Sequence, residues 1–411
     1  MVAIAGSRGF AAARVSRIVE TAGVSRATFY EHFSDRDECL LAAYEDLAGR
    51  VDAALGGLQA AAPEERLRCA LTELLTAAER SPAAARLMTI EVVGAGPGVR
   101  EARRRLHDRV EAAMRKELGG GKRVSQLPAS GLIGGVENVI ATRVFRGESN
   151  TLGRLLFDLI DWIDSYLHER NGLVIEDPRW DELARRMGTP GSVVLPEEVR
   201  LPRGRSALPA AAVEATQRDR ILRAVAVLSR ERGYLRTTVA EIVARAQISR
   251  QAFYNQFEGK RDAFKATQVA ALQAVMSRSA EAFFGADNWP DRVWNGLEAL
   301  LRHSAENPDL AYLDTVDSYA VGEEAIARSI ENRMAFNLFL AEGYEMRRNG
   351  RRLPQLCSEA IGGAILELLR SQVLGPGAEH SLEALPQAAY VALAPFVGSE
   401  EAAAYVNGRV E

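Results

Sequence analysis

Residues 25–33 read SRATFYEHF, and residues 249–257 of the same chain read SRQAFYNQF. The likeness extends upstream. When residues 15–33 are placed on residues 239–257 without a gap, nine of nineteen positions have identical residue types. A repeat of this length predicts that one structural element occurs twice in the chain.

A second, weaker sequence similarity supports the repeat. Ile133-Gly134-Gly135 recurs as Ile361-Gly362-Gly363, at nearly the same separation along the chain as the first pair of segments. Because the two separations nearly agree, we expect two tandem copies of one unit of about 200 residues, a period too long for a solenoid.

The pattern between these landmarks is helical. Residues 189–209 contain four prolines and two glycines, which break helices and favour extended backbone. Elsewhere apolar residues recur at the i, i+3, i+4 and i+7 spacing, so the sequence predicts an all-α fold.

Composition narrows the class of protein. The 411 residues are 47% hydrophobic and 26% charged, which suits globular cores. No run of about 18 apolar residues occurs and the N-terminus lacks the apolar core of a signal peptide, so we expect a cytoplasmic protein without a membrane partner. Cys39, Cys69 and Cys357 lack CxxC spacing, which favours buried thiols over zinc ligands or disulfides.

Catalytic motifs find little support. GGGK at 119–122 lacks the spacing of a phosphate-binding P-loop, and GAGPG at 94–98 follows no convincing strand. The five histidines form no HxxxH arrangement with a nearby carboxylate. We therefore expect neither an enzyme nor a bound cofactor or metal.

The charge is unevenly placed along the chain. The net charge is −4, yet residues 200–261 hold thirteen Arg and Lys against five Asp and Glu, whereas residues 1–38 hold five of each sign. Such a basic segment is typical of a localised phosphate-binding surface, although solvated helix faces also collect arginine. Phosphate neutralisation is expected mainly from the second copy.

The nonamer fits a helix-turn-helix. Val15, Ile18 and Val19 form an apolar stripe, and Gly23 lies where a left-handed turn is cheap. Ser25 is placed to cap a second helix. On this helix the phenylalanines share the buried face, and the small, polar and tyrosine side chains point outward. The buried pairs are Phe29 with Phe33 and Phe253 with Phe257.

GFAAARVSRIVETAGVSRATFYEHFSDRDECLLAAYE and GYLRTTVAEIVARAQISRQAFYNQFEGKRDAF both resemble the DNA-binding headpiece of TetR-type transcriptional regulators. The resemblance implies three N-terminal helices that bind double-stranded DNA and a helical body that binds a small molecule and dimerises through its last two long helices. For this chain it implies a DNA partner, an unidentified small-molecule effector, and either an intrachain pseudo-dimer or a homodimer. The implied boundaries are headpiece 1 at 1–45, body 1 at 46–188, a linker at 189–217, headpiece 2 at 218–265 and body 2 at 266–411.

Carried over by position, the resemblance implies base or phosphate contacts in both copies. Thr237 and Thr238 match a threonine pair of the family, where copy one has Ala13 and Arg14. The residues implied in copy one are Arg14, Ser25, Arg26, Thr28, Tyr30, His32 and Arg36. Those implied in copy two are Thr237, Thr238, Ser249, Arg250, Tyr254 and Lys260.

The outward faces of the two recognition helices differ. Copy one offers Ala27, Thr28 and Glu31, which suit a thymine methyl group and a cytosine amino group. Copy two offers Gln251 and Asn255, which can each pair bidentately with adenine. These differences predict two unlike half-sites in an asymmetric operator.

Both copies also depart from the family pattern. Met1 aligns with Val225, so most of the first headpiece helix is expected to be missing from copy one. Gln247 replaces Gly23, and a non-glycine in a left-handed turn costs about 1 kcal/mol. Ala252 replaces Thr28 and Gln256 replaces His32.

Two functions stay open from the sequence. The first is a ligand-responsive transcriptional regulator, and the second is a helical small-molecule-binding or interaction scaffold with impaired DNA binding. Arg203 and Arg205 belong either to a solvated linker or to an arm that enters the minor groove. The tryptophans are expected to pack in cores and are Trp162, Trp180, Trp289 and Trp294.

Overall fold

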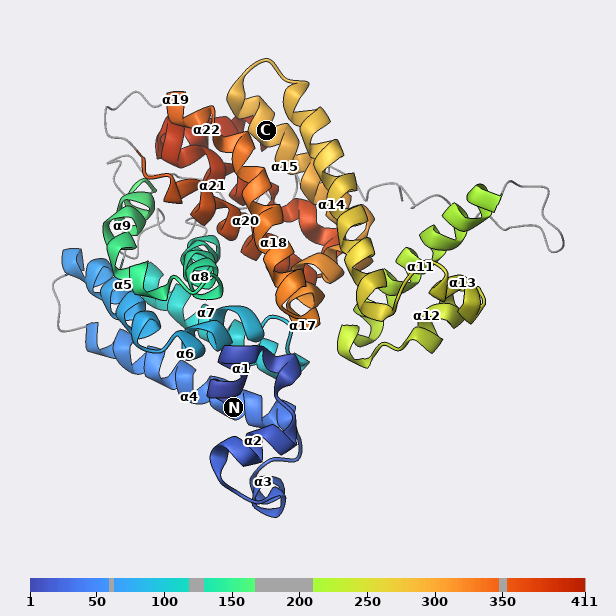
Figure 1. Cartoon of the computed structure of the whole chain (residues 1–411). Coiled ribbons are helices and arrows are strands. Elements are labelled where there is room, and N and C mark those ends of the chain that lie inside the picture. Colours follow the sequence, from blue (N-terminus) through green and yellow to red (C-terminus); the bar gives the residue numbers. More distant parts are fainter. Residues whose placement is uncertain (59–62, 118–128, 167–209, 347–352, 411) are drawn as a thin grey trace.

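The computed structural model describes residues 1–58, 63–117, 129–166, 210–346 and 353–410 (Figure 1). Within these ranges the chain forms helices and no strand, so the expected all-α fold is confirmed. The linker region up to residue 209, with Trp180, Arg203 and Arg205, lies outside the described residues, as does the GGGK stretch.

Each headpiece has the same order of elements. A first helix is followed by a short 3₁₀ turn and the two helices of the helix-turn-helix. In headpiece 1 these are α1 (Val2–Arg8), η1 (Phe10–Ala12), α2 (Val15–Ala22) and α3 (Arg26–His32). In headpiece 2 they are α11 (Ala210–Arg232), η5 (Tyr234–Arg236), α12 (Val239–Ala246) and α13 (Arg250–Tyr254).

The two bodies also repeat each other. Each begins with a long helix that leaves its headpiece, and each contains one π-helical turn, η3 (Leu87–Glu91) in body 1 and η6 (Leu313–Asp317) in body 2. Body 1 further contains α4 (Arg36–Gly57), α5 (Pro63–Arg80), α6 (Pro82–Arg86), α7 (Pro97–Glu117), α8 (Ala129–Phe145), η4 (Ser149–Leu155) and α9 (Leu156–Asp164). Body 2 further contains α14 (Lys260–Phe284), α15 (Trp289–Glu306), α16 (Pro308–Tyr312), α17 (Ser318–Val321), α18 (Glu323–Phe336), η7 (Asn337–Leu340), α19 (Gly343–Met346), α20 (Leu356–Leu374), η8 (Ala378–Ala384), α21 (Leu385–Val397) and α22 (Ser399–Val410).

The first helices of the headpieces differ in length. The short helix expected in copy one is α1, with 7 residues, whereas α11 has 23. Residues 210–217 read AAAVEATQ and form the first two turns of α11 instead of the linker that we expected there. Alanine is the best helix former and neither Pro nor Gly interrupts this stretch, so the helix already begins at Ala210.

The turn of the second helix-turn-helix carries the expected strain. Gln247 adopts a left-handed conformation, with φ 53° and ψ 46°, close to that of Gly23, with φ 68° and ψ 27°. Gln247 is the one non-glycine residue with positive φ in the described ranges. The backbone geometry is therefore kept in copy two although its side chain makes that geometry costly.

Helices α8 and α20 join the two bodies. They run antiparallel, since Gly131 lies against Leu368 while Asn138, two turns further along α8, bonds the carbonyl of Glu359. Their backbones come close at the glycine pairs: a methyl group added to Gly134 would lie 2.2 Å from Cβ of Glu367, and one added to Gly363 would lie 2.3 Å from Cβ of Asn138.

A single hydrophobic core spans this contact. Trp162 follows α8 in body 1, and its ring lies against Gly135, beside the α20 backbone. Trp289 and Trp294 of body 2 belong to the same core, so the three described tryptophans are packing residues as expected. Cys39 and Cys357 are buried thiols, and Cys69 is half-buried.

We expect Gly134→Ala and Gly363→Ala each to lower the free energy of unfolding by about 1–3 kcal/mol, because the helices must separate to admit the methyl group. The control is Gly49→Ala in α4, where open space surrounds the new methyl group and better helix propensity should stabilise by up to about 1 kcal/mol. Urea unfolding of the three variants measures both effects. Unchanged stability of both interface variants would show that the close contact is not required.

Candidate nucleic-acid interface

The recognition helices α3 and α13 begin in the same way. The Thr28 backbone N–H donates to Oγ of Ser25 at 3.0 Å, and the Ala252 backbone N–H donates to Oγ of Ser249 at 3.0 Å. Each serine thereby caps its helix, as the sequence indicated. The same hydroxyls lie at the exposed N-terminus of the helix, where backbone N–H groups favour a phosphate.

Aromatic pairs fix the outward tyrosines. Phe29 and Phe253 are buried, and each holds the following tyrosine edge-on at a ring distance of 5.3 Å. Tyr30 nevertheless stays 57% exposed and Tyr254 54% exposed. The two tyrosines therefore combine a packed ring edge with a side chain open to a partner.

Basic side chains flank these tyrosines. Arg26 and Arg250 are the first residues of their helices, and both are exposed. Neither has an ion-pair partner within the described ranges, which leaves both guanidinium groups available to phosphate. His32 and Glu31 are likewise exposed at the end of α3.

The proposed readers of copy two bond to each other in the free protein. The Gln251 Nε2 group donates to Oδ1 of Asn255 at 2.8 Å, one helical turn apart. Both side chains are exposed. This bond would have to open for both side chains to pair bidentately with adenine. If the bond stays, one amide can contact a base while the other amide orients the first.

Thr237 does not present its hydroxyl to solvent. It is 5% exposed, and its Oγ1 donates to the carbonyl of Gly233 at 3.1 Å. Thr237 therefore stabilises the turn, and its hydroxyl is not available for the DNA contact that the sequence predicted. Thr238 is exposed and forms a capping box with Glu241, while Arg14 begins α2 without a side-chain cap.

Lys260 also faces inward. Its Nζ donates to the carbonyls of Tyr234 and Thr237 at 3.0 and 2.8 Å and lies 4.4 Å from the centre of the Tyr234 ring. Burial lowers the pKa of Lys260. Arg36 lies in the same way over Phe10 at 4.5 Å. Both cations hold the turn of their headpiece, so phosphate contact would require them to leave these positions.

Sequence reasoning missed the junction between headpiece and body. The Phe10 backbone N–H donates to Oε2 of Glu91 at 2.7 Å, and the Tyr234 backbone N–H donates to Oδ2 of Asp317 at 2.7 Å. Both carboxylates are buried at the end of a π-helical turn. One signal could have found them, because the two acids occupy nearly equivalent positions in the two copies.

The junctions differ in charge balance. Arg86 donates to Glu91 at 2.8 Å and reaches Glu323 of body 2. Burial raises the pKa of Asp317 to about 6, although the positive charges of Arg100 and Lys260 act to lower that pKa.

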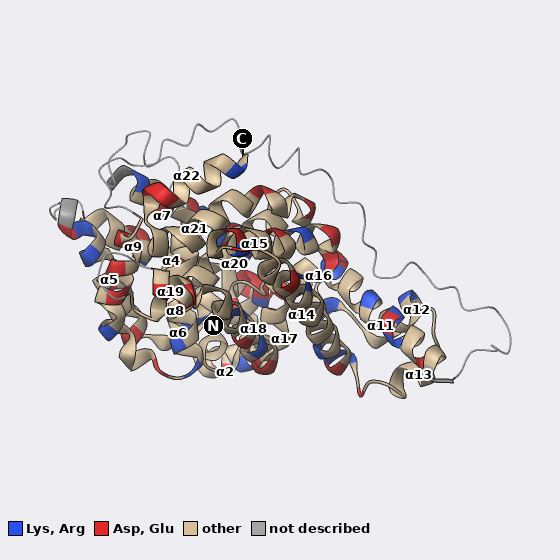
Figure 2. Cartoon of the chain, turned by 90° about the horizontal axis from the view of Figure 1, so that it is seen from above, with Lys and Arg blue, Asp and Glu red and all other residues tan. Residues whose placement is uncertain are grey.

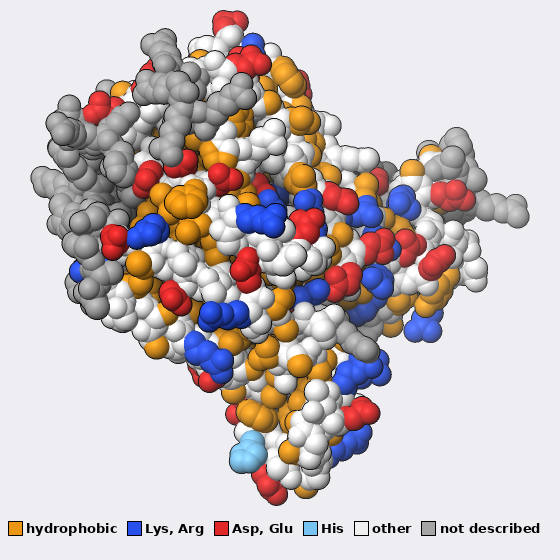
Figure 3. Space-filling view, turned by 60° about the vertical axis from the view of Figure 1, so that its left-hand side comes forward, with side chains coloured by type: hydrophobic (Ala, Val, Ile, Leu, Met, Phe, Trp, Pro, Cys, Tyr) orange, Lys and Arg blue, Asp and Glu red, His pale blue; other side chains and the backbone are white. Residues whose placement is uncertain are grey.

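The surfaces of the headpieces differ as their sequences do. In headpiece 2 several blue ribbon segments, which mark Lys and Arg, lie along α11 and α12 (Figure 2). Some of them are internally paired: Arg245 bonds Glu231 at 3.0 Å and Arg232 pairs with Glu241. Headpiece 1, the lobe at the bottom of Figure 3, carries acidic and basic side chains close together.

Other kinds of site have no support in the described residues. No group of three or more His, Cys, Asp or Glu side chains there could hold a metal ion. None of the described helices is long and apolar enough to cross a membrane.

Comparison with known proteins identifies the headpieces. The family profile described as "Bacterial regulatory proteins, tetR family" matches residues 2–43 and again residues 221–267. The chain thus carries two TetR-type DNA-binding domains in tandem. No curated protein sequence matches the chain.

Among the solved structures that are similar to part of this chain, three come from bacteria. A candidate TetR-family regulator from Syntrophomonas wolfei str. Goettingen shares 17% identity, with 48% of this chain and 93% of that chain covered and a TM-score of 0.35. PfmR from Thermus thermophilus, a TetR family transcriptional regulator, shares 20% sequence identity, with 46% of this chain and 93% of that chain covered and a TM-score of 0.34. A TetR family regulator from Marinobacter aquaeolei VT8 shares 15% sequence identity, with 49% of this chain and 96% of that chain covered and a TM-score of 0.32.

We expect Arg250→Ala to weaken DNA binding more than Arg36→Ala, and to lower the slope of log affinity against log salt by about 1, because Arg250 is free for phosphate whereas Arg36 lies over Phe10. The control is Arg104→Ala, which removes an exposed arginine of α7 that pairs with Glu101. Gel shifts across salt concentrations measure the slopes. Equal losses from Arg250→Ala and Arg36→Ala would contradict this ranking.

The raised pKa of Asp317 predicts a pH dependence of stability. A carboxyl whose pKa is raised on folding stabilises the native state below its unfolded pKa, and this contribution is lost as the pH rises through about 6. Wild-type protein should therefore lose stability relative to Asp317→Asn between pH 4 and pH 7, as measured by urea unfolding. Asp287→Asn, at an exposed carboxylate, is the control and should run parallel to wild type.

Proposed function

We propose that this protein is a sequence-specific DNA-binding transcriptional regulator in which one chain supplies both headpieces. The observation that carries the proposal is the matched pair of recognition helices. Each has a capped serine start, an exposed arginine without an ion-pair partner in the described ranges, and a tyrosine that is more than half exposed. Such a face supplies hydroxyl and guanidinium donors to the phosphates that flank a major groove.

The fused bodies favour one chain as the binding unit. Helices α8 and α20 of the same chain pack in the arrangement that two subunits would otherwise use. Linking two modules raises the effective concentration of each for the other to about millimolar. The free protein is then a particle of one chain, 44.8 kDa.

The two headpieces would read different sequences. Copy one presents Thr28 and Glu31, and copy two presents Gln251 and Asn255. A homodimer requires a palindrome because its symmetry repeats one reader, but an intrachain pair is released from that requirement. The operator is then asymmetric, with half-sites about one helical turn or slightly more apart.

The bodies would make binding responsive to a small molecule, most simply as a repressor that releases its operator. Glu91 and Asp317 link each body to the backbone of its own headpiece. An effector that binds one body state better shifts the equilibrium toward the headpiece spacing of that state. Removal of these acceptors by Glu91→Ala or Asp317→Ala would then alter the effector response.

The second candidate is a scaffold whose headpieces bind DNA poorly. Gln247 in the left-handed turn and the 7-residue α1 favour it, because both weaken the support of a recognition helix. Absence of any salt-dependent gel shift, at low salt and with the DNA upstream of the gene, would support the scaffold.

Selection of bound sequences from a random DNA pool tests the regulator. We expect two unlike half-sites, with Glu31→Ala relaxing base preference in one half and Gln251→Ala in the other, each by about 1–3 kcal/mol of discrimination. Glu20→Ala, at an exposed carboxylate of α2 outside the recognition helix, serves as the control. Recovery of a perfect palindrome whose halves respond alike to both variants would contradict the assignment of readers.

A further inference from the structure

The contact between α8 and α20 has a pseudo-twofold backbone. The alignment that places Gly134-Gly135 on Gly362-Gly363 assigns equivalent positions to residues of the two antiparallel helices. In a symmetric interface every contact across this axis would occur twice. The charged contacts occur once.

The Arg143 and Glu359 side chains form the cleanest of these contacts. Nη1 and Nη2 of Arg143 donate to Oε1 and Oε2 of Glu359 at 2.9 and 3.0 Å. In the glycine alignment, Ser371 is equivalent to Arg143 and Gly131 is equivalent to Glu359. The bidentate pair therefore has no counterpart on the other side of the axis.

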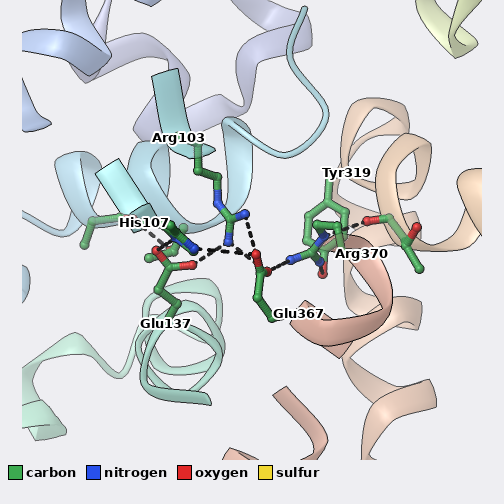
Figure 4. Close-up of polar contacts among 9 residues, drawn as sticks. Arg103, His107, Glu137, Tyr319, Glu367 and Arg370 are labelled. Carbon is green, nitrogen blue, oxygen red and sulfur yellow. Dashed lines mark hydrogen bonds and ion pairs between the residues drawn. The ribbon is translucent and has the colours of Figure 1, made fainter. Parts of the chain in front are cut away.

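A second, buried network of charged side chains also has no counterpart across the axis (Figure 4). Arg103 of α7 donates to both carboxylate oxygens of Glu367 at 2.9 Å, and also to Glu137 of its own copy at 2.6 Å. Arg370 donates to Glu367 at 2.6 Å. The alignment of Glu91 with Asp317 makes Ser329 equivalent to Arg103, and the glycine alignment makes Val139 equivalent to Glu367.

Pairing of like copies would break these contacts. Two copies of body 1 would place Arg143 opposite Gly131 and Arg103 opposite Val139. Two copies of body 2 would place Glu359 opposite Ser371. Arg143 and Glu359 would each lose the bidentate partner, and Arg103 would keep only Glu137 of its own copy. Loss of an opposite charge at a buried or half-buried side chain is strongly unfavourable.

We infer that the α8 and α20 faces form a pairing code, in which body 1 accepts a body 2 face and rejects a second body 1. The occupant of each face is the opposite copy of this same protein. The inference concerns assembly and holds whether or not the headpieces bind DNA. It favours contacts between unlike bodies over contacts between like bodies.

Charge exchange at one pair tests the code in the full-length chain. Arg143→Glu and Glu359→Arg each place like charges opposite each other, and the double variant restores opposite charges. We expect each single variant to lower the urea midpoint and the double variant to recover most of the loss. Arg104→Glu, on the exposed face of α7, is the control and should change the midpoint little.

Mixing the two single variants tests specificity. Between the two chains, each α8 face meets an α20 face of opposite charge, so co-refolding at equal concentration should yield a two-chain particle of about twice the 44.8 kDa mass, which neither variant forms alone. Light scattering measures the masses. The code is overturned if the single variants match the control in stability, or if the mixture contains no more two-chain particle than the separate samples.

Milder variants keep the test decisive if charge reversal prevents folding. Arg143→Ser installs the residue of the equivalent position, and Glu359→Gln removes only the charge. Under the code each lowers the urea midpoint, and the two losses combine to less than their sum because both remove the same contact. Strictly additive losses would contradict the inference.

Discussion

The close antiparallel contact of α8 with α20 fixes the positions of the other elements. Glycines at its centre let the two backbones approach, and any methyl group at Gly134 or Gly363 would overlap the opposite helix. Because Trp162 and the helices after α20 pack onto this contact, the two bodies share one hydrophobic core. The bodies in turn hold the headpieces through Glu91 and Asp317, so the headpiece spacing depends on the same contact.

Duplication has produced two headpieces of one shape with different supports. Headpiece 2 has a long first helix and a capping box at Thr238, but it tolerates Gln247 in a left-handed turn. Headpiece 1 has glycine in that turn, a short first helix and no side-chain cap at Arg14. Neither copy is the stronger at every position, which fits a chain in which both headpieces take part.

Local patterns in the sequence were sufficient for the fold. The spacing of Phe29 and Phe33 predicts the inward face of α3, where Phe29 is buried but Phe33 is only half-buried. The alignment of Gln247 with Gly23 predicts the left-handed backbone conformation of Gln247. These features depend on neighbours within one or two helical turns, which a repeat makes visible. The family profile confirms the tandem arrangement independently.

Features that depend on distant residues were not predictable in this way. Lys260 has a flexible stem that folds back over Tyr234, and Thr237 turns its hydroxyl to Gly233, so neither side chain points where the motif alone would place it. The acceptors of Phe10 and Tyr234 lie more than eighty residues away. Contacts such as Arg143 with Glu359, 216 residues apart, emerge only when the two copies are placed together.

The most direct test of the account is the mass of the complex with a minimal bound duplex, measured by native mass spectrometry. If one chain supplies two working headpieces, each duplex carries a single chain of 44.8 kDa, and this stoichiometry persists as protein is added in excess. A complex with two chains on each minimal duplex would show that the headpieces of one chain do not act as a pair, and would contradict the account.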